Sequence, residues 1–133
     1  MGDDLLVTEW HFWKSASGVG RDAWDVAKLI VQSTDLPVEQ VPLDSIGEID
    51  SVYWFDGVTY RPTVRSVVEH AERIRTVDPS HPILLGPDGR VMDGMHRIAR
   101  ALLDGRTTVD ARRFAELPEP DHRNIDPATL AVD

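Results

Sequence analysis

The sequence predicts an α+β fold, a small mixed sheet packed with helices. Residues 83–92 form a short apolar hairpin pattern around a Pro-Asp-Gly turn, and residues 107–114 are rich in alternating β-forming residues. Apolar residues recur at helical spacing over residues 63–74. We therefore expect the 133 residues to form a single domain, 1–133, with its core over residues 38–114.

The segments outside this core are expected to form a helical extension over residues 1–37 and a surface tail over residues 115–133. Asp22 can cap a helix over residues 23–33. Four apolar residues recur there at helical spacing: Trp24, Ala27, Ile30 and Val31. Three aromatic residues precede this helix, and core packing is favoured for them over a base pocket or a partner contact: Trp10, Phe12 and Trp13.

Each element of the core has its own local signal. Residues 38–43, with prolines at positions 37 and 42, predict a short edge strand. Thr63 is the expected N-cap of the first core helix, and Gly105 is expected to close the second. The first helix is expected to bury one stripe: Val64, Val67, Val68, Ala71 and Ile74. Two residues are expected to share the buried face of the last strand: Val109 and Ala111.

The composition excludes several classes of site and partner. The chain has no cysteine, so disulfides, cysteine nucleophiles and cysteine-based metal sites are excluded, and no histidine spacing indicates a metal site. The net charge of −9 disfavours nucleic acid, although residues 81–113 carry six arginines against four aspartates, which suits a small anion. Neither a membrane-spanning stretch nor a signal peptide is expected, and the expected location is cytoplasmic.

The motif Asp93-Gly94-Met95-His96-Arg97 stands between the hairpin and the second core helix. A strand, a sharp glycine turn and a helix start bring backbone N–H groups, the positive helix end and a guanidinium together. Asp93 is expected at the N-cap, where it accepts from the N–H of Met95 or His96. One face of the helix is expected to enter the core: Met95, Ile98, Ala99 and Leu102. His96, Arg97 and, one turn later, Arg100 then point elsewhere.

Two interpretations of this strand–turn–helix motif remain open at this level. It can hold a phosphate through Arg97, His96 and the N–H groups of Gly94 and Met95. It can equally be a capped helix whose histidine and arginine form surface ion pairs. Elsewhere, His70 is interpreted as a boundary histidine with its hydrogen bonds satisfied, and Tyr53 and Trp54 as core residues.

A family resemblance favours the first interpretation. The segments Ile83-Leu84-Leu85 and Gly89-Arg90-Val91-Met92-Asp93-Gly94-Met95-His96-Arg97, followed by Ala101 and Gly105, resemble the signature of the ParB/sulfiredoxin-like superfamily, the ParB N-terminal-like domain. The resemblance covers most of residues 38–114. It implies a nucleotide-phosphate site at Gly94, Met95, His96 and Arg97. It also implies that Thr63 and Arg65 border this site.

Members of this superfamily bind and hydrolyse CTP, repair an oxidised cysteine with ATP, or phosphorylate free serine. Met95 stands where sulfiredoxins carry their cysteine, so that repair chemistry is excluded here. The absence of a helix-turn-helix pattern and the acidic charge argue against chromosome segregation. The motif most resembles the free-serine kinase branch, in which its Asp and an upstream Glu serve substrate handling and base catalysis. Asp93 matches the first of these, and Glu48 or Asp50 could match the second.

The resemblance thus implies a nucleotide-phosphate-binding protein that uses ATP, ADP or CTP, with Mg²⁺ held through the phosphates. We expect a phosphotransferase (a kinase) or a nucleotide hydrolase acting on a small hydroxyl metabolite. Three residues are expected to serve catalysis: Asp93, His96 and Glu48. Seven are expected to bind phosphate or nucleotide: Gly94, Met95, His96, Arg97, Arg100, Thr63 and Arg65. The alternatives are a non-catalytic nucleotide-sensing or protein-interaction module and, less favoured, a DNA-binding or nuclease domain.

Overall fold

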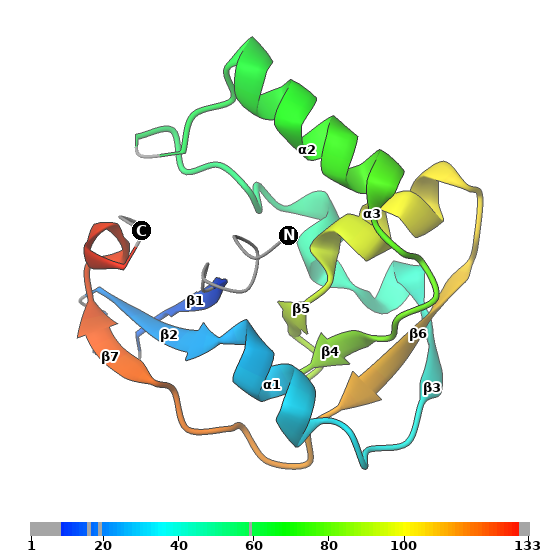
Figure 1. Cartoon of the computed structure of the whole chain (residues 1–133), viewed down its shortest axis with the longest axis horizontal. Helices are drawn as coiled ribbons and strands as arrows, with labels where there is room; N and C mark the ends of the chain where they lie inside the picture. The colour runs from blue at the N-terminus through cyan, green and yellow to red at the C-terminus, as the bar shows by residue number, and fades with distance from the viewer. Residues whose placement is uncertain (1–8, 16, 19, 59, 131–133) are drawn as a thin grey trace, which may run out of the picture. The chain divides into compact units, whose positions relative to one another are not determined.

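A computed structural model describes residues 9–15, 17–18, 20–58 and 60–130, and these have the expected mixture of helices and strands. The chain divides into two compact units, and the expectation of a single domain stays a prediction. The core unit comprises residues 36–115, and the outer unit comprises residues 1–35 and 116–133 (Figure 1). Residues 1–8, to which the expectation about a signal peptide refers, lie outside the described residues.

The core unit is built on a four-stranded mixed sheet in the order β3-β6-β4-β5. Its strands are β3 (Glu39–Pro42), β4 (Ile83–Leu85), β5 (Val91–Asp93) and β6 (Thr108–Arg113). The β4–β5 hairpin and the β3–β6 pair are antiparallel, whereas β4 and β6 are parallel and joined through α3 (Met95–Leu103). The predicted edge strand is confirmed as β3, whose Pro42 is tolerated because an edge position leaves one side of the strand unpaired.

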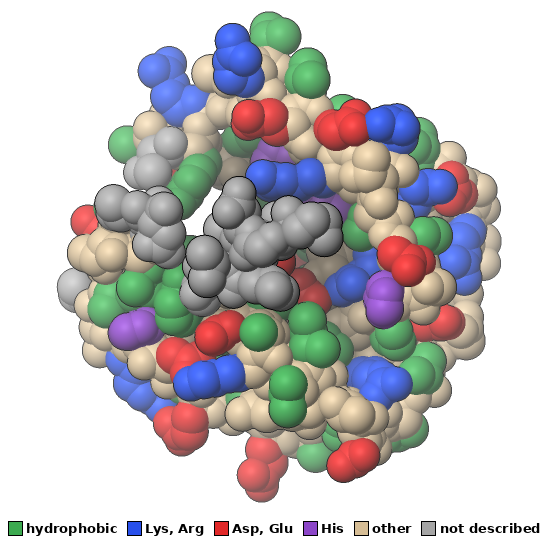
Figure 2. Space-filling view, viewed as in Figure 1, with side chains coloured by type: hydrophobic (Ala, Val, Ile, Leu, Met, Phe, Trp, Pro, Cys, Tyr) green, Lys and Arg blue, Asp and Glu red, His purple; other side chains and the backbone are tan. Residues whose placement is uncertain are grey.

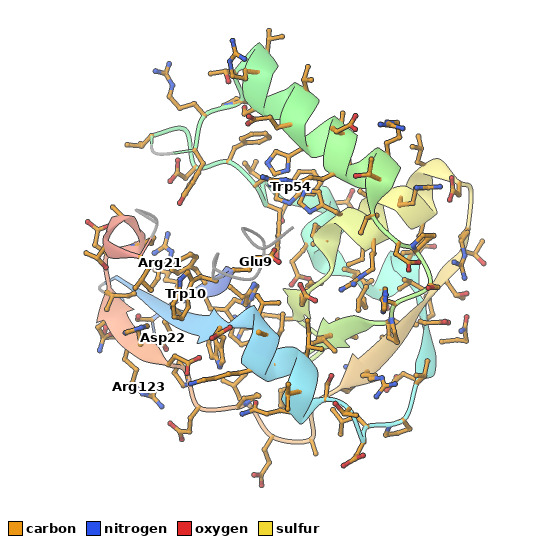
Figure 3. The ribbon with its side chains drawn as sticks, viewed as in Figure 1. Glu9, Trp10, Arg21, Asp22, Trp54 and Arg123 are labelled. Carbon is orange, nitrogen blue, oxygen red and sulfur yellow. The ribbon has the colours of Figure 1, made fainter. Side chains whose placement is uncertain are left out.

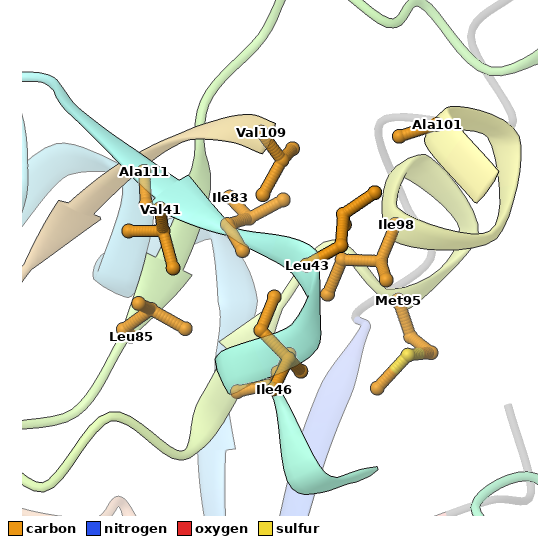
Figure 4. Packing of buried hydrophobic residues seen from close by; sticks show 11 residues of the cluster. Val41, Leu43, Ile46, Ile83, Leu85, Met95, Ile98, Ala101, Val109 and Ala111 are labelled. Carbon is orange, nitrogen blue, oxygen red and sulfur yellow. The ribbon is translucent and has the colours of Figure 1, made fainter. Parts of the chain in front are cut away.

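Helix α3 packs on this sheet through a narrower face than the sequence suggests. Met95, Ile98 and Ala101 are buried, whereas Leu102 is 46% exposed, which corrects the expected core face. The helix is therefore rotated toward its Ala101 side. The buried cluster of the core unit (Figure 4) consists of Val41, Leu43, Ile46, Ile83, Leu85, Val91, Met95, Ile98, Ala101, Val109 and Ala111. The predicted burial of Val109 and Ala111 is thus confirmed.

The end of α3 satisfies its free carbonyl groups in the way that a terminal glycine allows. Gly105 adopts φ +75°, and its N–H donates to the carbonyl of Leu102 while the N–H of Arg106 donates to that of Ala101. This pair of bonds is a Schellman motif, in which a left-handed residue follows the helix. The expectation that Gly105 closes this helix is confirmed.

Helix α2 (Val64–Thr76) begins as predicted but is not buried as predicted. The hydroxyl of Thr63 accepts from the backbone N–H of Ser66 at 3.1 Å and so caps the helix. No residue of α2 is buried, however, and Val64 is 83% and Val68 59% exposed. The reason is that α2 meets α3 through its later turns, and its first turns extend beyond α3 (Figure 1). Figure 2 shows apolar side chains over this projecting end.

The outer unit corrects the expectation of a helical extension. Its sheet is three-stranded, in the order β1-β2-β7, with β1 (Trp10–Lys14) and β2 (Arg21–Asp25) both from the N-terminal segment. Helix α1 (Val26–Gln32) starts three residues later than predicted, with Asp25 rather than Asp22 as its N-cap. Trp24 lies in the strand instead, where it is 2% exposed and its ring meets that of Trp13 edge to face. Strand packing of this indole overrides the weak helical periodicity.

In the C-terminal segment, expected to form a surface tail, the described residues 116–130 include a strand and a short 3₁₀ turn. Strand β7 (His122–Ile125) pairs with β2, and the Asp121 carboxylate accepts from the N–H of Asp25 and from the Lys28 ammonium group. Trp24 donates from its indole N–H to the carbonyl of Pro118 at 2.8 Å. A short 3₁₀ turn follows at Pro127–Thr129. Within the described ranges, no helix has the length and apolar character needed to cross a membrane.

Two glycines with positive φ allow the cost of backbone strain to be separated from the cost of crowding. An ideal Cβ at Gly94 (φ +110°) would lie 2.7 Å from Cγ2 of Ile83, whereas one at Gly105 (φ +75°) meets nothing within 4 Å. We predict that Gly105→Ala lowers the free energy of unfolding by about 1 kcal/mol, through strain alone. Gly94→Ala should lower it by about 2–4 kcal/mol, because overpacking is added. Urea denaturation measures both, and equal losses would contradict the proposed crowding.

Candidate functional site

The motif turn places the start of α3 beside the end of β5. β5 ends at Asp93, Gly94 turns the chain in the left-handed region, and α3 begins at Met95. Gly94 is therefore the N-cap, and no side chain caps the helix. The expectation that Asp93 caps α3 is wrong, because its carboxylate is engaged elsewhere. The first N–H groups of α3 consequently have neither an intrahelical acceptor nor a side-chain cap.

Asp93 instead forms an ion pair with Arg97, one helical turn ahead. The Asp93 carboxylate and Nη2 of Arg97 are 2.8 Å apart, and the two side chains are 22% and 15% exposed. The Nε atom of Arg97 is buried and has no hydrogen-bond partner among the described residues. One edge of the guanidinium is thus held by Asp93, while a donor on the rest of the group is unsatisfied. An unsatisfied buried donor costs free energy, which an anionic ligand would recover once a movement of the guanidinium exposed this atom.

His96 forms part of a stack of three rings that joins α2 to α3. Nδ1 of His70 and Nε2 of His96 are 2.8 Å apart, and the planes of the two rings are nearly parallel, with an interplanar angle of 18°. The indole of Trp54 stacks on both imidazoles, with centroid distances of 4.3 Å to His70 and 4.7 Å to His96. Figure 3 shows Trp54 beneath α2. The interpretation of His70 as a satisfied boundary histidine missed that its partner is the motif histidine.

Both histidines have lowered pKa values, which favours their neutral forms. Burial, the neighbouring His70 and then Arg73 lower the pKa of His96 to about 4. Burial and then Arg73 lower the pKa of His70, against a smaller opposing effect of Glu69. Two neutral imidazoles in contact share one N–H, so one ring donates and the other accepts. Nδ1 of His96 is then either a donor or an acceptor, according to which ring donates.

Glu48 and Tyr53 lie next to the motif aspartate. The Glu48 carboxylate accepts from the backbone N–H of Val91, in the strand that leads to Asp93, at 2.7 Å. Burial, followed by the charges of Glu48 and Asp93, raises the pKa of the Tyr53 phenol, which therefore remains protonated. Of the two acidic residues that the sequence offered upstream, Glu48 is the one that contacts β5, whereas Asp50 is exposed.

A cavity of about 380 Å³ opens beside these groups, between residues 48–55 and α3. The lining from residues 48–55 comprises Glu48, Ile49, Ser51, Val52, Tyr53, Trp54 and Phe55, and the lining from α3 comprises Met95, Ile98, Ala99 and Leu102. Its size falls within the range of small-molecule sites. The sequence interpretation of Tyr53 and Trp54 as core residues holds in part, since both pack partly buried against the core cluster.

Three of the expected phosphate-binding residues are not brought to the turn. Arg100 donates from Nη1 to the carbonyl of Arg75 at 2.7 Å and pairs through Nε with Asp104, so it ties α2 to α3. Thr63 and Arg65 lie at the exposed start of α2, and Thr63 is about 10 Å along the helix axis from His70. Gly94, Met95, His96 and Arg97 remain at the start of α3 as expected, with Asp93 and Glu48 beside them.

The turn suits an anion better than a metal ion. No group of three histidine, aspartate or glutamate residues within the described part of the chain is arranged to hold a metal. The uncapped helix start and the unsatisfied Nε of Arg97 fit a phosphate group, and a metal ion would be held chiefly through phosphate oxygens. Comparisons of the chain with family models, with curated proteins and with solved structures found no match.

The lowered pKa values of the two histidines predict that the core unit loses stability in mild acid. The unfolded chain protonates these rings near pH 6.5, whereas the folded rings resist until lower pH, so the free energy of unfolding falls as the pH drops from 6.5 toward 4. Between about pH 7 and about pH 5 we expect the double variant His70→Asn/His96→Asn to lose less stability than the wild type. The difference should be on the order of 1 kcal/mol, reduced by solvent screening. Equal losses in urea denaturation would contradict this account.

Proposed function

We propose that this protein binds the phosphate groups of a nucleotide at the start of α3 and transfers or hydrolyses a phosphoryl group. The uncapped first turn of α3, beside a guanidinium with a buried unsatisfied Nε, carries the proposal. N–H groups at a helix start and a nearby arginine are favourable partners for phosphate oxygens. Gly94, Met95, His96 and Arg97 would hold the phosphates of ATP, ADP or CTP, with Mg²⁺ bridging them.

We propose further that this chain belongs to the ParB/sulfiredoxin-like superfamily. The order of elements in residues 36–115 supports it, since an edge strand, a helix, a hairpin, the motif helix and a strand parallel to β4 follow one another. The free-serine kinase branch has the closest motif. The placement of Glu48 beside the strand that ends in Asp93 agrees with the two acidic roles that this branch implies.

Phosphoryl transfer would draw on two kinds of group at this turn. Arg97 and the N–H groups would offset phosphate charge, which is the main requirement of this reaction. The Glu48 and Asp93 carboxylates would accept a hydrogen bond from an attacking hydroxyl or water. Because Asp93 already holds Nη2 of Arg97, its first role is to orient the guanidinium. Glu48 is the carboxylate without a basic side-chain partner among the described residues.

The exposed apolar start of α2 favours a second candidate, a non-catalytic nucleotide-sensing module that binds a protein. Val64, Val67 and Val68 are 83%, 49% and 59% exposed, and clustered exposed apolar side chains often mark contact surfaces. Incubation with ATP or CTP and Mg²⁺, followed by ³¹P NMR, separates the two candidates. If this protein consumes the nucleotide with no partner protein present, the result supports the enzyme. If it binds the nucleotide but forms no product with any alcohol of a panel, the result supports the sensor.

The first test of phosphate binding replaces the guanidinium. We predict that Arg97→Ala weakens the binding of ATP and CTP with Mg²⁺ by about tenfold to a hundredfold, because charge-assisted bonds are lost. Arg90→Ala is the matched control, since Arg90 is an exposed arginine in the hairpin turn that pairs with Asp88. Isothermal titration calorimetry measures both affinities, and thermal unfolding checks the fold. Equal affinities in the two variants would refute phosphate binding at this turn.

A second substitution tests the role of Asp93. Asp93→Asn removes a negative charge within 2.8 Å of Arg97 while retaining a side chain that can hydrogen-bond. We predict that nucleotide affinity rises about threefold to tenfold, because repulsion of the phosphates is removed and the guanidinium charge is no longer offset. If calorimetry showed weaker binding instead, orientation of Arg97 by the Asp93 charge would outweigh the repulsion.

A further inference from the structure

The cavity beside α3 has two chemically different parts. Among the residues that line it, Glu48, Ser51 and Tyr53 carry polar side chains, and the charges of Glu48 and Asp93 both act on the Tyr53 phenol, which places these three groups near one another at what we call its polar end. The remainder is almost entirely apolar, with aromatic walls from Trp54 and Phe55 and an aliphatic floor from α3. A cavity of about 380 Å³ can enclose a ring with a short chain, and apolar walls of this kind contribute most of the binding free energy of small ligands.

The charges around the cavity decide whether it suits the phosphate groups of a nucleotide or the hydroxyl group that would accept a phosphoryl group. Two carboxylates lie near its polar end: Asp93 pairs with Arg97, whereas Glu48 accepts from a backbone N–H and has no ion pair with a described residue. Phosphate groups would be repelled from Glu48, so the anionic part of a nucleotide belongs at Arg97 and the helix start. A hydroxyl, by contrast, can donate to the Glu48 carboxylate and accept from the Tyr53 phenol. The polar end therefore favours a neutral hydroxyl over an anion.

Met95 belongs both to the proposed phosphate site at the start of α3 and to the cavity. It is the first residue of α3, so its N–H belongs to the uncapped helix start, while its side chain lines the cavity. Glu48 is linked to the turn from the other side, through its bond to the N–H of Val91. A hydroxyl at the polar end of the cavity would thus lie beside the place proposed for the phosphates.

We infer that this cavity binds a neutral alcohol whose body is an apolar ring or a branched chain of similar size. The inference rests on the proposed function, in which that alcohol is the acceptor of the phosphoryl group. It changes the expected substrate class, because the sequence suggested a small hydroxyl metabolite and the cavity walls disfavour a fully polar one. A polar molecule such as glycerol would leave its hydroxyl groups unpaired against these walls.

The transfer itself balances with a nucleoside triphosphate as the second reactant. The alcohol oxygen forms a bond to the γ-phosphorus, the bond from that phosphorus to its bridging oxygen breaks, and the nucleoside diphosphate leaves with the electron pair. The hydroxyl proton passes to the Glu48 carboxylate and then to solvent. Glu48 is the acceptor of this proton because Asp93 is held by Arg97.

The test uses the whole chain and measures binding rather than turnover. The probes are 3-phenylpropan-1-ol, glycerol, and 3-phenylpropionate, which has the same ring with an anionic end. We expect the alcohol to bind at least about tenfold more tightly than either of the other two, since glycerol lacks the buried ring and the anion meets Glu48 and Asp93. Methyl NMR signals of Met95, Ile98 and Leu102 report occupation of the cavity. Tighter binding of glycerol or of the anion would overturn the inference.

Cavity-filling variants locate the binding. Ala99→Trp and Val52→Trp both place an indole at the cavity lining, the second at a position that is 79% exposed and so tolerant of substitution. Each should weaken alcohol binding about tenfold or more while leaving the binding of tripolyphosphate unchanged. Val64→Trp, at a position that is 83% exposed and not part of the lining, is the control and should change neither. Alcohol binding that survives both filling variants would overturn the inference.

Two further outcomes separate this inference from the proposed function. Displacement of the alcohol by adenosine or cytidine would show that the cavity takes a nucleobase, and the inference would fail while phosphate binding stood. If the wild type bound the alcohol but neither tripolyphosphate nor ATP, the proposed function would fail and the assignment of the cavity to an alcohol would stand.

Discussion

The close contact between Gly94 and the β4 strand is the constraint on which the rest of the core unit depends. At Gly94 the backbone turns in the left-handed region, and Ile83 and Arg97 approach so closely that a Cβ there would force a neighbouring side chain to shift. This contact fixes where β5 ends and the direction in which α3 leaves the sheet. It therefore also fixes Arg97 against Asp93, His96 against His70, and Met95 at the boundary between the buried cluster and the cavity.

Much of the core unit could be predicted from local sequence, because its signals are short-range. The Thr63 cap, the Pro-Asp-Gly hairpin, the Gly105 helix end and the alternation in β6 each depend on residues within a few positions of one another. The outer unit could not be predicted in this way. Pairing of β2 with β7 joins residues about one hundred positions apart, and the helical spacing around Trp24 gives no indication of it.

The candidate site shows the same division between local and non-local information. Adjacency in sequence was enough to bring Gly94, His96 and Arg97 to one turn. It was not enough to show that Asp93 prefers Arg97 to the helix N–H groups, because an N-cap and a partner four residues ahead are both plausible for an aspartate at a helix start. The partners of His96 and Asp93 from residues 48–70 depend on tertiary packing. Apolar spacing in α2 was likewise a poor guide to burial, since nothing in the pattern indicates how far α2 extends beyond α3.

The electrostatics of the turn bear on the phosphate site that we propose in a chain of net charge −9. The local field at the start of α3 comes from one guanidinium, the helix N–H groups and two neutral histidines, and Asp93 offsets part of it. Such a site would hold a phosphate moderately rather than tightly, because the binding groups carry little net positive charge. Moderate binding is compatible with turnover, in which the charged product must leave, and it would be a disadvantage for a permanently bound cofactor.

The two histidines near the start of α3 also keep the positive charge of the turn low. If His70 and His96 were charged, they would add two positive charges at the helix start, but burial and then the charge of Arg73 lower the pKa of His70, and burial, His70 and Arg73 lower that of His96. The lowered pKa values of His70 and His96 would thus limit the anion affinity that we propose for Gly94 and Arg97 at the same turn.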